Sequence, residues 1–295
     1  MITAIENSTP KQVRRIGILL GDLGMLNRNR AALQFLVLQM NTLQQTFEYE
    51  FLPVDDNDEF IQKFSNQRYV EMNGSKNEVQ PFLQNYQKYL SSEIQDYSIK
   101  EKTLSSHFIL VSMACFDNHH YSMIAHNLAI LALGNWKRYM APPSLIEFIL
   151  MLIVRESIAL VCQPLESSVH LGTRGCLCDF TPFLDEVRLK ILNGFICHSC
   201  CTTLKSEGFR ELPQELQLLL KKDWLGKANE PEKPAGIVAH LGYDLFTTKG
   251  LKATWWEISK RTLQEEWLKS LLTLLITVLG AILVGFLVLR LGLSK

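Results

Sequence analysis

The feature that most constrains this chain is an uninterrupted apolar run near its carboxyl end. Residues 271–289 read LLTLLITVLGAILVGFLVL and contain no charge. A helix of that length, rising 1.5 Å per residue, crosses about 30 Å of hydrocarbon. Aromatic and basic residues of the kind that anchor a helix at a bilayer surface flank the run: Trp255, Trp256, Lys260, Arg261, Trp267, Lys269, Arg290 and Lys295. A buried core helix is the alternative, but core helices rarely stay apolar on every face over such a length. We predict one transmembrane helix, within a tail anchor of residues 267–295.

A carboxyl-terminal anchor has consequences for topology and partners. Only six residues follow the run, so we expect a single-pass protein, inserted late, whose N-terminal body stays in the cytoplasm. The lipid bilayer is then its first partner. Ala281 and Gly285 form a small-xxx-small pair, with Gly280 beside it, and such pairs allow helices to pack closely in lipid. A homo-oligomer is therefore one expectation.

The remainder has the composition of a folded body. Hydrophobic residues make up 47% of the 295-residue chain, and Lys plus Arg equal Asp plus Glu at 30 each. No net field attracts nucleic acid, so we expect no such partner. Apolar runs of strand length at 15–20, 107–113 and 128–133 alternate with helical patterns at 29–45 and 144–162. This predicts an α/β domain over residues 15–227, after a flexible segment 1–14 and before a linker and juxtamembrane region, 228–266.

Cysteines are concentrated in one part of this domain. Five of the seven lie between residues 176 and 201, and no N-terminal signal peptide is evident. Clustering of this kind in a reducing compartment favours a metal site over disulfides. Cys197 and Cys200 form a C-x2-C knuckle about twenty residues after Cys176, a spacing typical of tetrahedral zinc.

The fourth zinc ligand is open at this point. The candidates within residues 170–204 are His170, Cys178, His198 and Cys201, and we favour His170. Two other interpretations compete with structural zinc. The cysteines can be reduced, buried residues that behave as small apolar side chains. One of them can instead be a catalytic thiol that a histidine activates.

Residues 105–204 resemble the archaemetzincin family of zinc peptidases. The segment GCLCDFTPFLDEVRLK followed by FICHSC is similar to the family's cysteine-rich tail, and a strand, a loop with Tyr121, a strand and a long helix precede it in the family's order. The resemblance implies a metzincin-like mixed sheet with helices and a Cys-rich zinc knuckle. It also implies Cys176, Cys197 and Cys200 as structural-zinc ligands, although Leu171 stands where the family has its first cysteine.

The family's catalytic motif is incomplete in this chain. Where HExxH is expected, the helix reads Arg155-Glu156-Ser157-Ile158-Ala159, and His170 comes too late to match the third histidine of the motif. A catalytic zinc needs three protein ligands and a bound water. Glu156 is therefore only a weak catalytic candidate, and we predict that peptidase activity is lost.

Three functions follow from this combination. The first is a pseudoenzyme with structural zinc that binds a protein partner or ligand and acts through its anchor, in its most specific form as a membrane-acting effector in bacterial defence. The second is a membrane-tethered hydrolase whose unusual metal site uses His119, His120, His170 and Glu156. The third is a scaffold that localises a partner enzyme.

Overall fold

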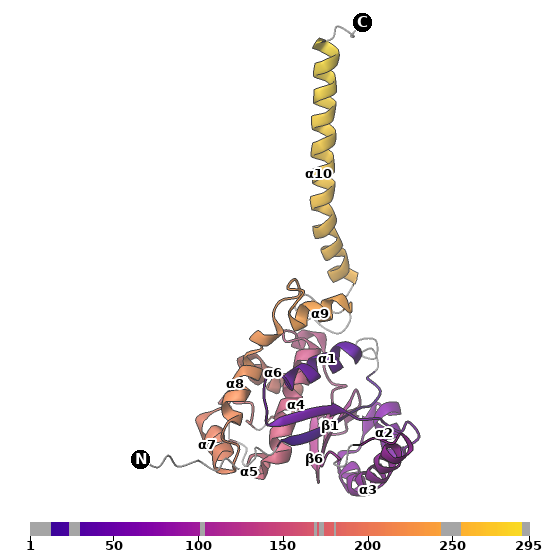
Figure 1. Cartoon of the computed structure of the whole chain (residues 1–295), viewed down its shortest axis with the longest axis vertical. Coiled ribbons are helices and arrows are strands. Elements are labelled where there is room, and N and C mark those ends of the chain that lie inside the picture. The colour runs from indigo at the N-terminus through magenta and orange to yellow at the C-terminus, as the bar shows by residue number, and fades with distance from the viewer. Residues whose placement is uncertain are drawn as a thin grey trace. The chain divides into compact units, whose positions relative to one another are not determined.

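The computed structural model in Figure 1 describes residues 13–23, 30–100, 104–167, 170, 174–179, 181–242 and 255–290. The chain divides into two compact units, Met1–Leu251 and Lys252–Lys295. In chain order, the first unit contains β1 (Arg14–Leu20), α1 (Arg30–Met40), β2 (Phe47–Phe51), α2 (Glu59–Asn66), β3 (Tyr69–Val70), α3 (Met72–Asp96), β4 (His107–Ser112), β5 (Cys115–Phe116), β6 (Ser122–Ala125), β7 (Leu128–Ala132), η2 (Arg138–Met140), α4 (Leu145–Val161), α5 (Gln163–Ser167), α6 (Leu184–Asn193), α7 (His198–Ser206), α8 (Leu212–Lys221), η3 (Asp223–Leu225) and α9 (Pro234–His240).

A five-stranded mixed sheet forms the centre of this unit. Its strand order is β2-β1-β4-β7-β6. Neighbouring pairs among β2, β1, β4 and β7 are parallel, and β6 runs antiparallel to β7 at the edge. Strands β4 and β7 lie inside the sheet and are almost wholly buried, which explains their continuous apolar sequences. The predicted α/β class is confirmed.

Helices cover both faces of the sheet. Ile16, Ile18 and Ile109 point to one face, where they share a core with residues of α1, α4, α6 and α8. Leu19 and Leu110, one residue further along their strands, point to the other face and pack with α2 and α3. This alternation follows from the two-residue period of a strand. The unit therefore has three layers.

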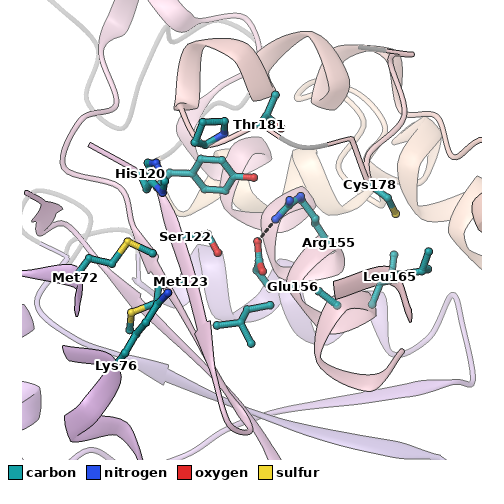
Figure 2. Close-up of a pocket in the computed structure, with 15 residues that line it drawn as sticks. Met72, Lys76, His120, Ser122, Met123, Arg155, Glu156, Leu165, Cys178 and Thr181 are labelled. Atoms are coloured by element: carbon teal, nitrogen blue, oxygen red, sulfur yellow. Dashed lines mark hydrogen bonds and ion pairs between the residues drawn. The ribbon is translucent and has the colours of Figure 1, made fainter. Parts of the chain in front are cut away.

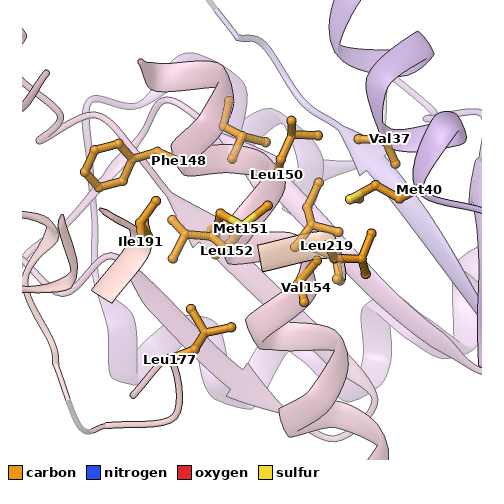
Figure 3. Close-up of a cluster of buried hydrophobic side chains, with 14 of the residues drawn as sticks. Val37, Met40, Phe148, Leu150, Met151, Leu152, Val154, Leu177, Ile191 and Leu219 are labelled. Carbon is orange, nitrogen blue, oxygen red and sulfur yellow. The ribbon is translucent and has the colours of Figure 1, made fainter. Parts of the chain in front are cut away.

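Helix α4 is the main structural element of the larger core. Ser144 caps it, since its hydroxyl accepts from the Glu147 amide at 3.3 Å while Glu147 accepts from the Ser144 amide at 2.7 Å. Its side chains from Phe148 to Val154 are fully buried. Figure 3 shows several of them among residues of α1, α6 and α8. The helix is thus enclosed over the two turns that precede Glu156.

Two segments differ from the sequence prediction. The stretch between β4 and β7, expected as a loop, contains β5 and the edge strand β6. Residues 234–240 fall in the predicted linker but form α9, where Ala235 and Val238 are fully buried. Helix α9 contacts α1 and η3, and this packing explains why the segment is ordered as part of the domain.

The second unit contains one long helix, α10 (Trp255–Arg290). Over the residues that the structure describes, no helix combines the length and the apolar character that crossing a membrane requires. Several side chains of the predicted transmembrane run, including those of Leu271 and Leu272, lie outside the described set, and so do the surroundings of Gly285. The transmembrane helix and the small-residue packing face stay predictions.

Candidate functional site

A glycine turn brings the cysteine knuckle into position. Helix α6 ends at Gly194, whose φ of +55° favours glycine. A Cβ atom at this position would lie 2.3 Å from the Leu220 carbonyl oxygen, so the close approach of α8 also requires glycine. The chain then reaches Cys197 at the N-cap of α7 and Cys200 in its first turn. Two thiols three residues apart consequently lie on the same side of the helix start.

A second segment supplies the other two candidate ligands. His170 and Asp179 pair as an isolated parallel bridge, and Cys176 lies in the loop that returns to Asp179. This loop is tied to the knuckle by backbone contacts: the Leu177 amide donates to the Phe195 carbonyl at 2.7 Å. The Cys197 amide donates to Cys176 Sγ at 3.2 Å. These two hydrogen bonds hold the two segments side by side.

Four donor atoms converge between these segments. Those of His170, Cys176, Cys197 and Cys200 all lie within 4.8 Å of one another, and the three cysteines are buried. His170 Nε2 is 3.2 Å from both Cys197 Sγ and Cys200 Sγ, and Cys176 Sγ is 4.0 Å from Cys200 Sγ. A tetrahedral zinc with Zn–S bonds of about 2.3 Å sets its sulfur atoms about 3.8 Å apart. The four residues fit such an ion.

Asp179 orients the histidine. Its Oδ1 lies 2.5 Å from His170 Nδ1, and its Oδ2 accepts from the Arg174 and Cys176 amides at 2.8 and 3.1 Å. A carboxylate at Nδ1 holds the proton there, which leaves the Nε2 lone pair facing the thiols. Asp179 is fully buried, so its contact with the imidazole is shielded from water.

Hydrogen bonds among the thiols favour the thiolate form of Cys176. Side-chain hydrogen bonds with Cys178 and Cys200 lower the pKa of Cys176, and the bonds with Cys176 raise the pKa values of Cys178 and Cys200. Thiolates are the form that binds zinc. Four protein donors are the number that a closed, structural zinc site requires.

Three of the other predicted ligands lie apart from this group, whereas Cys178 hydrogen-bonds to Cys176 without belonging to the four-atom group. The Cys201 thiol points to the Ile196 carbonyl at 4.0 Å, and His198 is exposed. His119 is exposed as well. Throughout the described part of the chain, no group that could hold a metal forms around His119, His120 and Glu156. The described structure therefore does not bring together the residues of the alternative hydrolytic metal site.

Glu156 instead lines a separate cavity of about 360 Å³ (Figure 2). Its carboxylate is fully buried and its Oε1 lies 2.5 Å from Arg155 Nη1. Arg155 Nε donates to the Leu177 carbonyl at 3.2 Å, so the loop that carries Cys176 also fixes the arginine. Burial raises the pKa of Tyr121, another lining residue, to about 12, although the charge of Arg155 opposes this.

Comparisons with known proteins give one distant similarity. No family model matches the chain, and no curated protein matches it. Among solved structures, it is similar to archaemetzincin from Methanopyrus kandleri, at 11% identity and a TM-score of 0.40. The similarity covers 68% of this chain and 98% of the other. Membership of the archaemetzincin family stays a prediction.

Proposed function

We propose that this chain is a zinc-stabilised binding protein without peptidase activity, tethered to a membrane by its carboxyl-terminal helix. The convergence of His170 Nε2 with three buried thiols is the observation that carries the zinc part of the proposal. When bound, the ion would supply cross-linking rather than catalysis, because four protein ligands leave no open position for water. His170, Cys176, Cys197 and Cys200 would hold it.

The Glu156 cavity supports binding rather than hydrolysis. Helix α4 contains no histidine, whereas a catalytic zinc requires three protein ligands. Glu156 directs one carboxylate oxygen to Arg155. A glutamate without such a water has no strong nucleophile to activate. The cavity nevertheless has the size of a small-molecule site.

The membrane part of the proposal depends on the sequence of residues 271–289, which contains no charge. The described side chains of α10 include exposed apolar residues such as Leu274, Ile276 and Leu279. Contiguous apolar surface of this kind is unusual in water and is typical of interaction sites, including membrane-binding ones.

Metal analysis of the purified full chain in detergent micelles tests the zinc site. We expect one zinc per chain, and loss of that zinc in the Cys197→Ser, Cys200→Ser double variant. Cys201→Ser is the matched control and should keep the metal, because its thiol points away. A chain without zinc would refute the structural site, and two zinc ions per chain would support the hydrolase instead.

Activity and localisation need separate measurements. A peptidase assay of the wild type is expected to show no turnover, and an activity that Glu156→Gln abolishes would refute the binding role.

The full chain should resist alkaline extraction from membranes, whereas a chain lacking residues 267–295 should be released. Cellular toxicity that depends on the same residues would favour an effector over a scaffold, and crosslinking that captures only monomers would exclude action by oligomerisation.

A further inference from the structure

The cavity beside α4 contains a buried carboxylate oxygen that lacks a partner. Glu156 is fully buried, and its Oε2 has no hydrogen-bond partner among the described residues. Leaving a buried acceptor unpaired is unfavourable, and more so when it is charged. Figure 2 shows Glu156 among the lining residues with its other oxygen bound to Arg155. The missing partner must therefore be a donor that comes from the cavity side.

An exposed cation lies at the cavity wall formed by α3. Lys76 lines the cavity and is exposed, and it has no ion-pair partner in the part of the chain that the structure describes. Because Arg155 and Glu156 already neutralise each other, a ligand can meet two groups here. Glu156 Oε2 needs an N–H or O–H donor, and the exposed ammonium group of Lys76 can pair with an anion.

One class of small molecule can bind both groups. We propose that this cavity binds an amino carboxylate, whose ammonium group donates to Glu156 Oε2 and whose carboxylate pairs with Lys76. The zwitterion adds no net charge beside the buried Glu156, which limits its desolvation cost. Hydroxyl groups of Ser122 and Thr181 also line the cavity. This inference rests on the proposed binding role of the cavity and specifies its ligand.

Methionine methyl signals provide a local reporter of binding. Met72 and Met123 both line the cavity. The full chain, labelled with ¹³C at its methionine methyl groups and held in detergent micelles, is titrated with glycine, β-alanine, 4-aminobutyrate and 6-aminohexanoate. These four probes share their end groups and differ in the distance between them. Butylammonium and butyrate each carry one of the two end groups, and butanol carries neither.

The expected result is a preference for one probe length. That probe should shift the Met72 and Met123 signals and bind at least tenfold more tightly than butylammonium or butyrate. Glu156→Gln should reduce its affinity to that of butyrate, and Lys76→Gln should reduce it to that of butylammonium. Lys88→Gln, an exposed lysine on the same helix that does not line the cavity, is the matched control and should bind as the wild type does.

Two results would overturn the inference. One is the absence of any shift at Met72 and Met123 up to about 10 mM of every probe, which would mean that water alone occupies the cavity. The other is binding of butanol as tight as that of the zwitterions. If Glu156→Gln does not fold, Lys76→Gln and the probe comparison on the wild type still decide the question. Zinc content measured on the same samples distinguishes failure of this inference from failure of the proposed zinc site.

Discussion

Replacing Asp179 with asparagine tests how the candidate zinc site is organised. In the wild type the carboxylate accepts from His170 Nδ1 on one oxygen and from the Arg174 and Cys176 amides on the other. Asparagine has a single acceptor oxygen, so its NH₂ group must face one of these donors. The imidazole or the Cys176 loop then loses its fixed orientation. Loss of a carboxylate that orients a metal-binding histidine typically costs 10–100-fold in metal affinity, which corresponds to about 1.4–2.8 kcal/mol.

The Asp179 substitution also affects Lys190, so the experiment needs a control for that effect. Its ammonium group is fully buried, 3.9 Å from Asp179 Oδ2 and 2.9 Å from Thr181 Oγ1. Burial lowers the pKa of Lys190, and the charge of Asp179 opposes that effect. Asp179→Asn therefore also removes the counter-charge of a buried cation, a loss that destabilises proteins whether or not zinc is bound. Lys190→Met removes the cation, so a comparison within that background isolates the orientation of His170.

Zinc affinity is measured on the full chain in detergent micelles, by competition with a chromophoric chelator. We expect Asp179→Asn to weaken zinc binding 10–100-fold both in the wild type and in Lys190→Met. The free energy of unfolding of the metal-free protein should fall in both backgrounds through the lost hydrogen bond, and it should fall further where Lys190 is present. Equal zinc affinity with aspartate and asparagine, in both backgrounds, would refute the claim that Asp179 orients the ligand set.

Three further predictions follow from the same contacts. Cys178→Ser should keep one zinc per chain in metal analysis and Cys200→Ser should lose it, because His170 and not Cys178 completes the four-atom group. Ser144→Ala should lower the free energy of unfolding in urea by about 1 kcal/mol through loss of the α4 cap. Burial raises the pKa of Tyr121 to about 12, so its contribution to stability is complete below pH 10 and is lost as the pH rises through 12. From pH 10 to pH 12 the free energy of unfolding should fall in both proteins. The decrease should be about 2–3 kcal/mol smaller in Tyr121→Phe than in the wild type.

The sequence predicted those elements whose signals are local. Strands β4 and β7 were evident as continuous apolar runs, and α4 followed from Ser144 and the long apolar stretch behind it. Strand β6 was missed because the polar residues before it suggested one long loop. A signal was present nonetheless: the hairpin of β6 and β7 closes through the two residues His126 and Asn127, and His126 has a φ of +52°. Two-residue turns of this kind require positive φ values.

The candidate zinc site, like the fold, was predicted only in part from the sequence. The C-x2-C spacing placed Cys197 and Cys200 together, because two residues three positions apart at the start of a helix are neighbours in any fold. Asp179 and Lys190 were not predicted, since contacts around a ligand shell follow no fixed spacing along the chain. The pairing of Glu156 with Arg155 was also missed. Adjacent residues on a helix normally point in different directions, so their ion pair depends on the loop that holds Arg155 through the Leu177 carbonyl.

The candidate zinc site and the cavity share a wall. Cys178 lines the cavity, and its thiol hydrogen-bonds to the ligand Cys176. Thr181 lines the cavity too, and it lies two residues after Asp179 in the same turn. A metal that holds Cys176 in place therefore also restrains the surface that a ligand would contact. Because binding free energies at coupled sites are reciprocal, a ligand that stabilises this wall raises the affinity for zinc by the same factor that zinc raises the affinity for the ligand.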